Sequence, residues 1–319
     1  MAITGDSDFV PNWLLKAALR RGWTLVSANY RTIPESTGLD LAEDVLDAFR
    51  YVSSSGQNSL SHDLNIPGLV DPSRIIIAGS SGGGYCAAIG TLEVLKQATA
   101  KPDFPKPAAT LIIYPMLDLL SPHWICKGID LDLSDEDAEA GRKDLERRLA
   151  SKEVSFGERF NDDIDISHHT RWNLLRYLIK VPLFVDYFTG VNGLSEKLIA
   201  AASTSDSAYE DAKKELVPTK ERGLFILDFD NLRSDMPPLF VIHGAADAWV
   251  PVAESDKLVE KAKSLGVPTS YWRLEGLGHD FDLPYPDLED PEQEPPEVDS
   301  LGQNAVKEFL QKIDKLVRI

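Results

Sequence analysis

The stretch RIIIAGSSGG at residues 74–83 decides the fold of this 319-residue chain. Its first half is an unbroken run of β-branched residues, which is typical of a strand buried on both faces of a sheet. Its second half has the pattern G-x-S-x-G centred on Ser81, and small residues from Gly82 to Gly90 then open a predicted helix. A sharp strand-to-helix turn of this kind presents a serine hydroxyl at the edge of a parallel sheet. Ser81 is therefore the candidate nucleophile.

The glycines around Ser81 have a predicted role. Gly79, Gly82 and Gly83 are expected to relieve crowding in the turn, and the backbone N–H of Gly82, with that of Gly83, can donate to a developing oxyanion. Two other interpretations stay open at this point. The turn can be glycine-rich without any chemistry, and Gly82-x-Gly84-x-x-Ala87 also fits a dinucleotide fingerprint. The fingerprint is weak, because no acidic residue ends the next predicted strand.

Elements on both sides of this stretch alternate between strand and helix. The patterns predict helices at 10–21, 39–52, 82–98, 252–265 and 303–317, and strands at 24–28, 75–78, 110–114, 239–242 and 269–274. This alternation predicts an α/β fold, in which helices cover both faces of a mostly parallel sheet. The predicted core therefore consists of residues 1–118 and 236–319.

Two segments interrupt the alternation. Residues 119–235 are charge-rich and helical, with a capping-box start at Ser134 and acids in the first turn, so they are expected to form a helical cap or lid. Residues 280–299 contain nine acids, five prolines and no basic residue, which is typical of an extended acidic loop.

A serine nucleophile requires a base and an acid that orients the base. Asp247 lies just after the predicted strand 239–242, and His279 lies just after the strand 269–274. The carboxyl ends of parallel strands meet at one edge of a sheet, where ligands gather. The order Ser81, Asp247, His279 is also the order this chemistry takes on such sheets. Each residue alone has a plain structural explanation, and the combination favours a catalytic triad.

The other candidates for chemistry are weaker. Asp118 is a substitute acid in what is more simply a turn, and His243 precedes a glycine at a strand end, where a structural role is expected. His168 and His169 follow several aspartates, but Ile166 stands where a calcium loop requires glycine. We interpret that cluster as a solvated face of the cap, and we expect no metal site.

Composition excludes several classes of function. The net charge of −18 disfavours nucleic acid and anionic membranes as partners. No run of about 18 apolar residues could span a membrane, and the first residues lack the pattern of a signal peptide, so a cytoplasmic location is expected. The two cysteines, Cys86 and Cys126, form no disulfide framework and are expected to be reduced, with a single bridge as the open alternative. Cys86 is expected to be a small buried packing residue.

These residues together resemble the α/β-hydrolase superfamily, and specifically its hormone-sensitive-lipase-like carboxylesterases (α/β hydrolase fold-3). The resemblance rests on NYRTIPE at 29–35, EDV at 43–45 and DPSRI at 71–75, together with the Ser81 turn, Asp247 and His279. It covers most of the chain outside residues 119–235. Ser80 departs from the family pattern, because an acid is common there.

The family also has a His-Gly-Gly-Gly loop after its third strand, whose N–H groups form most of the oxyanion hole. No such motif occurs in this sequence. The family's first strands and this loop would precede Met1, which favours a truncated sequence, with a genuinely shortened protein as the open alternative. Without the loop, we expect a poorly active enzyme. The third strand of the family lies between the strands that would correspond here to 24–28 and 75–78. We expect its loss to leave a gap or to force those two strands to pair.

The resemblance implies a serine hydrolase that cleaves small-molecule carboxylic esters. In that mechanism Ser81 attacks the carbonyl carbon, His279 transfers the proton and Asp247 orients His279, and no cofactor or metal is needed. Apolar residues of the cap are candidates to line the acyl pocket, although ordinary packing inside the cap explains them equally well: Trp172, Leu175, Leu178, Phe184 and Phe188. Two alternatives stay open, namely a non-catalytic small-molecule-binding protein on the same scaffold and a lactonase or peptidase. The sequence does not predict the oligomeric state.

Overall fold

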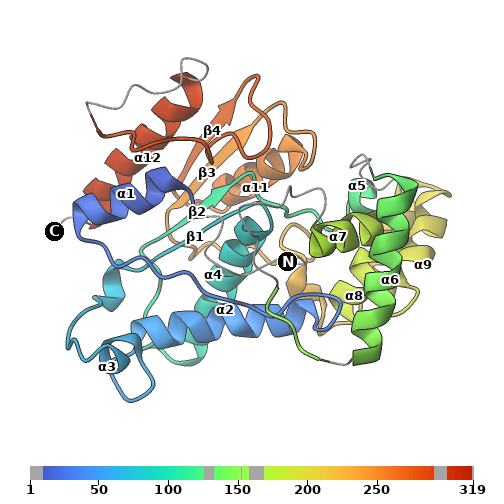
Figure 1. The fold of residues 1–319 in the computed structure, drawn as a ribbon, viewed down its shortest axis with the longest axis horizontal. Helices are drawn as coiled ribbons and strands as arrows, with labels where there is room; N and C mark the ends of the chain where they lie inside the picture. The colour runs from blue at the N-terminus through green and yellow to red at the C-terminus, as the bar shows by residue number, and fades with distance from the viewer. Residues whose placement is uncertain (1–9, 126–132, 152, 158–168, 291–299, 318–319) are drawn as a thin grey trace. The chain divides into compact units, whose positions relative to one another are not determined.

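The predicted parallel sheet is present in the structure, a computed structural model that describes residues 10–125, 133–151, 153–157, 169–290 and 300–317. Four strands pair in parallel in the order β1-β2-β3-β4 (Figure 1). They are β1 (Ile76–Ser80), β2 (Ala109–Ile113), β3 (Leu239–Gly244) and β4 (Thr269–Leu274). Every residue of β2 and β3 is buried, which explains why both sequences are unbroken apolar runs. The α/β prediction is therefore confirmed.

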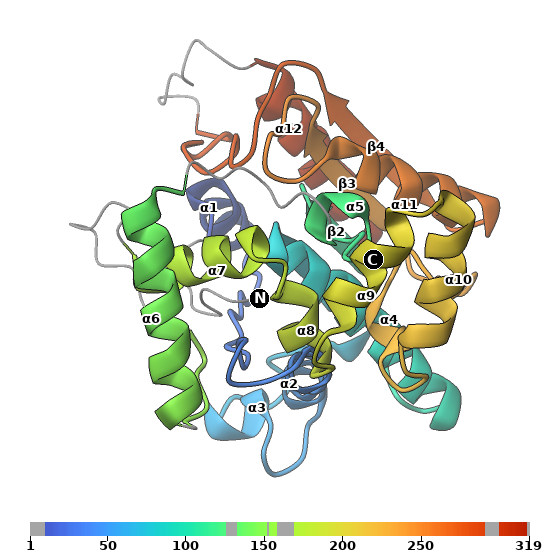
Figure 2. The ribbon, with the colours of Figure 1, turned by 90° about the vertical axis from the view of Figure 1, so that its right-hand side faces the viewer.

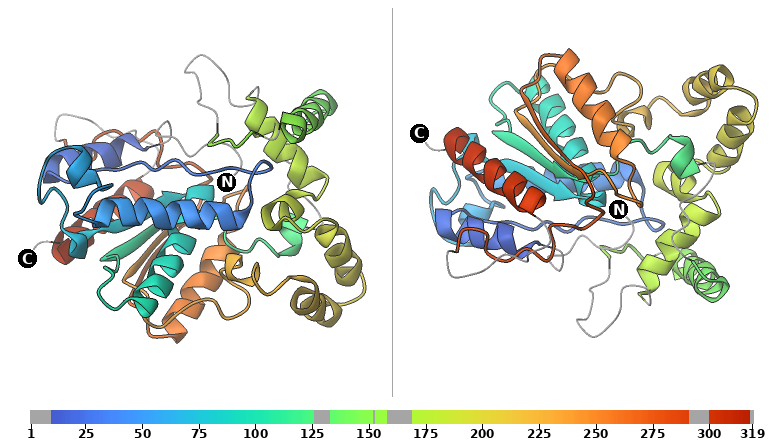
Figure 3. Two further views of the ribbon diagram at one scale, coloured as in Figure 1. Left: turned by 90° about the horizontal axis from the view of Figure 1, so that it is seen from below. Right: turned by 90° about the horizontal axis from the view of Figure 1, so that it is seen from above.

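Helices cover both faces of this sheet (Figure 3). On one face α1 (Asn12–Arg21) and α12 (Ser300–Val317) pack in a single apolar cluster with alternate side chains of the central strands, among them Leu111 and Phe240. On the other face lie α4 (Gly82–Ala100), which contacts β1 and β2, and α11 (Val252–Ser264), which contacts β3 and β4. The predicted helices match these within a few residues.

The remaining helices are, in chain order, α2 (Gly38–Ser53), α3 (Leu60–Asp63), α5 (Pro122–Ile125), α6 (Asp135–Ser151), α7 (Thr170–Lys180), α8 (Phe184–Thr189), α9 (Leu194–Ala202) and α10 (Asp206–Leu216), with short 3₁₀ turns at Pro72–Arg74 and Arg222–Leu224. The predicted capping box of α6 is present, because the Ser134 hydroxyl accepts the N–H of Asp137. Gly22 ends α1 in the left-handed conformation, as glycine commonly does.

The predicted strand at 24–28 is wrong. These residues form neither helix nor strand, and the side chains of Leu25 and Val26 are each 41% exposed. A strand requires a hydrogen-bonded neighbour. Within the described residues, β1 pairs with β2 alone and is the first strand of the sheet. Of the two outcomes expected for a missing third strand, direct pairing of 24–28 with β1 is therefore excluded.

The chain divides into two compact units. One contains residues 28–44 and 117–231, and the other contains residues 10–27, 45–116 and 232 onward, including the whole sheet. The first unit is helical, with α6 packed along α7 (Figure 2). The segment predicted as a separate insertion thus groups with residues 28–44, and its role as a lid stays a prediction.

Buried ion pairs explain that grouping. Glu35, from the family-like segment 29–35, binds Arg171 of α7 at 2.6 Å and Arg148 of α6 at 3.0 Å, and all three side chains are at most 7% exposed. Arg31 of the same segment binds Asp40 and Asp44. The motif that carried the resemblance is therefore structural in this chain, since it holds residues 28–44 against the helices.

The acidic segment 280–290 is not an extended solvated loop, so that prediction is wrong for its described part. Asp282 and Asp287 are 0% and 5% exposed, and Tyr285 between them is also buried. Asp287 binds Arg20 of α1 at 2.6 Å, and Arg21 binds Glu289. The basic end of α1 thus neutralises acids that the sequence places far away. Residues 291–299 lie outside the described part of the chain.

Within the described residues, no helix is long and apolar enough to cross a membrane. Cys86 is a free, buried thiol, as predicted, and Cys126 lies outside the described residues.

Candidate active site

Ser81 occupies a strained turn between β1 and α4. Its φ is +52° and its ψ is −122°, a conformation that L-residues rarely adopt. A Cβ on Gly79 would lie 2.0 Å from the carbonyl oxygen of Gly83, and one on Gly84 would lie 2.7 Å from Pro115. The turn therefore requires glycine at 79 and 84. The predicted steric need at Gly83 is wrong, since a Cβ there would meet nothing within 4 Å.

The structure brings together the three side chains proposed as a triad, all within the unit that contains the sheet. Ser81 Oγ lies 3.0 Å from His279 Nε2, and Asp247 Oδ2 lies 2.7 Å from His279 Nδ1. With Nδ1 protonated, His279 donates to Asp247 and its Nε2 accepts the Ser81 proton. This arrangement can deprotonate the hydroxyl as it attacks an electrophile.

Asp247 is fixed in its ionised form. Its side chain is 0% exposed, and its Oδ1 accepts the backbone N–H groups of Trp249 and Val250 at 2.8 and 2.9 Å. Burial works to raise the pKa of Asp247, but the hydrogen bonds from His243 and His279 outweigh burial and hold that pKa well below its usual range. The carboxylate therefore stays charged while it orients His279.

His243 also contacts the Asp247 carboxylate, and the sequence analysis did not predict this contact. The ring is completely buried at the end of β3. Its Nε2 lies 3.3 Å from Asp247 Oδ2 and 3.1 Å from the carbonyl oxygen of Val250, and its Nδ1 lies 2.8 Å from Ser255 Oγ of α11. The predicted structural role for His243 thus includes a direct contact with the proposed catalytic acid. The four-residue spacing of His243 and Asp247 across the turn after β3 was the available signal.

A buried carboxylate holds the loop that carries His279. Asp282 accepts the indole N–H of Trp13 at 3.0 Å and the hydroxyl of Tyr114. The Tyr114 ring in turn lies 4.5 Å from the His279 ring, measured between centroids, and Trp249 contacts the same imidazole at 5.3 Å. Burial raises the pKa of Asp282, and the two donors only partly offset that effect. Helix α1, remote in sequence, therefore helps to position the imidazole.

The predicted pocket residues lie in the helical unit. Leu178, Phe184 and Phe188 are 0–1% exposed, and the rings of Phe184 and Phe188 stack at 5.8 Å. Trp172 is also buried and Leu175 is half-buried. This burial supports the alternative of packing inside the unit, and a contribution to the acyl pocket stays a prediction.

The weaker candidates occupy other places. Asp118 is buried in the helical unit. His169 is 6% exposed, so its predicted place on a solvated face is wrong, while His168 and the preceding aspartates lie outside the described residues. The described residues contain no group of His, Cys, Asp and Glu side chains able to hold a metal ion. A groove of about 810 Å³ between α2 and the end of α4, lined by Arg50, Tyr51 and Phe104 among others, includes no residue of the triad.

Fold and site together define an α/β hydrolase with a serine at the strand-to-helix turn. Residues 2–132 match a family model described as alpha/beta hydrolase fold. The fold is similar to an α/β hydrolase superfamily protein from Enterococcus faecalis (TM-score 0.56, 17% identity, 99% of this chain and 86% of that chain). It is also similar to an esterase from the bacterial hormone-sensitive lipase family (TM-score 0.51, 16% identity, 96% and 70%). The chain has the α/β-hydrolase fold, and these matches support its resemblance to the hormone-sensitive-lipase-like esterases.

The sequence is also similar to parts of two longer proteins. The chain is 26% identical over 293 residues to methylphloroacetophenone synthase of Cladonia uncialis, covering 86% of this chain and 10% of that protein. It is 30% identical over 159 residues to Lipase 2 of Moraxella sp., covering 42% of this chain and 35% of that protein. The match thus spans about a tenth of the first relative and about a third of the second.

Proposed function

We propose that this protein is a serine hydrolase that cleaves carboxylic esters through an acyl-enzyme. The observation that carries the proposal is the continuous hydrogen-bond chain from Ser81 Oγ through His279 to Asp247, at 3.0 and 2.7 Å. Similarity to a lipase and to an esterase of this fold supports the ester bond as the target.

The reaction follows from the geometry. Ser81 Oγ attacks the acyl carbon while its proton passes to His279 Nε2, and the imidazolium is stabilised by Asp247. The bond from acyl carbon to leaving oxygen then breaks, and His279 returns the proton to the leaving alcohol. Water next gives a proton to His279 as it attacks the acyl-enzyme, which releases the acid and restores the Ser81 hydroxyl.

The oxyanion that forms in each step needs donors. Gly82 and Gly83 are the first residues of α4, whose leading N–H groups lack partners inside the helix. We assign the oxyanion contact to these N–H groups. One such donor is typically worth about 10²–10³ in rate, so a site with few of them is a slow one.

A fluorophosphonate probe tests the proposal directly. We expect covalent labelling of the wild-type protein, none in Ser81→Ala, and a loss of labelling rate of at least about 10³-fold in His279→Ala. Folded wild-type protein that neither labels nor hydrolyses p-nitrophenyl acetate or butyrate would support the non-catalytic binding protein instead. A lactone and a peptide amide in the same assay separate the lactonase and peptidase alternatives.

A second candidate function is the release of an acyl chain made by a polyketide synthase. Two of the curated relatives are named as non-reducing polyketide synthases, and they match 82% and 91% of this chain but only 10% and 12% of their own length. In this case the acyl donor is a thioester, and the same triad performs the transfer. Relative rates on an oxoester and a thioester of one acyl group distinguish the two candidates.

A further inference from the structure

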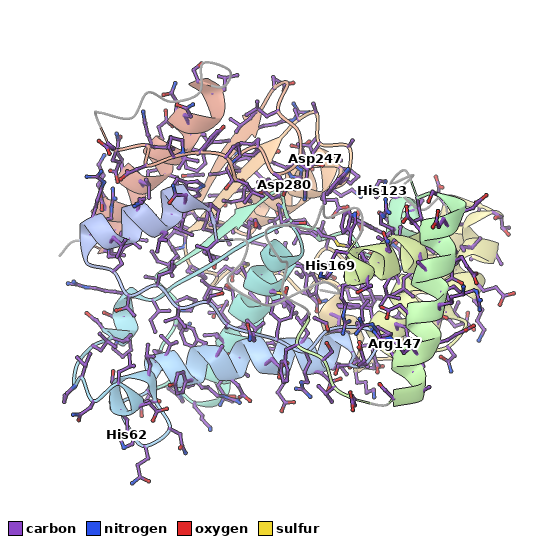
Figure 4. All side chains as sticks on the ribbon, viewed as in Figure 1. His62, His123, Arg147, His169, Asp247 and Asp280 are labelled. Atoms are coloured by element: carbon purple, nitrogen blue, oxygen red, sulfur yellow. The ribbon has the colours of Figure 1, made fainter. Side chains whose placement is uncertain are left out.

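Three carboxylates surround the His279 imidazole, and two of them are already engaged. Asp247 binds Nδ1 and accepts two backbone N–H groups. Asp282 accepts hydrogen bonds from Trp13 and Tyr114. The third is Asp280, whose Oδ1 lies 3.6 Å from His279 Nε2, the nitrogen that also faces Ser81. Figure 4 shows Asp247 and Asp280 close together beside the ends of β3 and β4.

The Asp280 carboxylate is available for a substrate. Its side chain is 43% exposed, whereas that of Asp247 is 0% exposed. Within the described residues, its one close polar contact is His279 Nε2, and no side chain or backbone group donates a hydrogen bond to it. A partly exposed carboxylate beside the reacting nitrogen can therefore contact a charged group of a bound substrate.

The backbone holds this carboxylate in place at an energetic cost. Asp280 has a φ of +55°, in the left-handed region that non-glycine residues occupy rarely. The loop is anchored on both sides of Asp280, because His279 binds Asp247 and Asp282, two residues further on, binds Trp13 and Tyr114. Its carbonyl oxygen accepts the N–H of Leu283, which closes the turn. Strain of this kind is concentrated at functional sites.

The position of Asp280 identifies the part of a substrate that it meets. During acylation, His279 Nε2 passes its proton to the leaving oxygen, which must then lie within hydrogen-bond reach of that nitrogen, about 3 Å away. We propose that Asp280 forms a leaving-group subsite that favours esters whose alcohol carries a positive charge and disfavours those whose alcohol carries a negative charge. This inference rests on the proposed ester hydrolase activity and names its substrate class.

The charged groups that face Asp280 set the conditions of the test. Burial raises the pKa of Asp280, His279 opposes that effect, and the neighbouring Asp282 and Asp247 add to it. The carboxylate therefore ionises at a higher pH than an ordinary aspartate, whose pKa is about 3.9, and pH 8 lies far above that value. An assay at pH 8 therefore measures the charged form.

The test compares the rates of hydrolysis of three butyrate esters of similar size. Their alcohols are choline, its uncharged carbon analogue 3,3-dimethylbutanol and 3-hydroxypropanesulfonate. We expect kcat/KM in the order cationic, neutral, anionic, with about fivefold between successive members, the size of a partly exposed ion pair. The differences should shrink as salt is raised to 1 M, because the charges are partly exposed.

Variants of Asp280 test whether its carboxylate causes the preference for a cationic leaving group. Asn and Gly both accept the left-handed conformation, so Asp280→Asn and Asp280→Gly remove the charge without new strain, and both should bring the three rates to within about twofold of one another. Glu260→Gln, which removes one charge from the exposed side of α11, is the matched control and should keep the wild-type order.

The outcomes separate the two proposals. A wild-type enzyme that hydrolyses the neutral ester but shows no charge preference, or a preference that persists in Asp280→Asn, overturns the subsite alone. Absence of both fluorophosphonate labelling and hydrolysis of all three esters overturns the hydrolase activity, and the subsite with it.

Discussion

His243 is the residue outside the triad whose replacement tests the site most sharply. An Asn amide reaches about as far as the Nδ1 of histidine, and a Gln amide about as far as Nε2. His243→Asn therefore keeps the contact with Ser255 and loses the donor to Asp247 and Val250. His243→Gln keeps the donor to Asp247 and Val250 and loses the contact with Ser255. The two substitutions therefore test separately the contacts made by Nδ1 and by Nε2 of this buried ring.

The expected magnitudes follow from what each variant leaves without a partner. In His243→Asn, the buried carbonyl of Val250 and the carboxylate of Asp247 lose a donor, which should lower the free energy of unfolding by about 1–3 kcal/mol. Asp247 keeps its two backbone donors and His279. The loss in kcat/KM should therefore be moderate, about 3- to 10-fold, or roughly 0.7–1.4 kcal/mol. His243→Gln should retain most of the wild-type activity.

The variants also differ in their response to acid. The folded-state pKa of Asp247 lies below its unfolded value, so the carboxylate adds stability above the unfolded pKa of about 3.9, and this stability is lost as pH falls through the folded pKa. Without the His243 hydrogen bond, the folded pKa rises toward the ordinary value and the contribution shrinks. Urea unfolding at pH 7 and at about pH 2 should show a smaller difference between the two pH values in His243→Asn than in the wild type, because the stability is lost only below the unfolded pKa.

A destabilised control makes the result interpretable. Thr91→Val removes the hydrogen bond of 2.8 Å to Thr110, which is buried between α4 and β2 and contacts no triad residue. It should lower stability by about 1–2 kcal/mol and leave kcat/KM within about twofold. The reasoning on His243 is refuted if His243→Asn behaves like Thr91→Val, or if His243→Gln is as inactive as His243→Asn.

Three further predictions concern the fold. Gly79→Ala should prevent folding or lower the melting temperature by more than 10 °C, because its Cβ would lie 2.0 Å from a carbonyl oxygen, whereas Gly83→Ala should shift it by only a few degrees. Arg171→Met should cost about 3–5 kcal/mol in urea unfolding, since it leaves the buried Glu35 with one cation fewer. Arg20→Gln should leave the midpoint of urea unfolding almost unchanged, because Arg20 is 43% exposed and water screens its ion pair with Asp287, and a clear drop in that midpoint would contradict this.

The sequence predicted correctly those elements that are determined by residues close together in the chain. The β-branched run before Ser81 and the glycines around it predicted the strand, the turn and the helix, and all three are present. Asp247 and His279 could be found because each follows a strand, and parallel strands end at one edge of the sheet. The topology of the sheet therefore placed three distant residues together before any coordinates were known.

The wrong predictions share a physical cause. The conformation of each of these segments depends on contacts with residues far away in the chain. Residues 24–28 have the composition of a short strand, but strand formation needs a neighbour, and β1 pairs with β2 instead. The acids of 280–290 predicted a solvated loop by composition alone. In the structure Arg20 and Arg21 neutralise Asp287 and Glu289, and Trp13 donates a hydrogen bond to Asp282, from some 270 residues earlier in the chain. No local pattern contains such pairings.

The same long-range contacts explain why an acidic loop can carry the histidine proposed as the catalytic base. Several carboxylates near one imidazole would repel one another and leave its orientation undefined. Here the donors from Trp13 and Tyr114 engage Asp282, and the backbone of Trp249 and Val250 engages Asp247. Among the described residues, no protein group donates a hydrogen bond to the Asp280 carboxylate, which faces His279 Nε2. Helix α1 thus acts on the site by binding the loop, so the charge at the site depends on a helix that lies far from Ser81 in sequence.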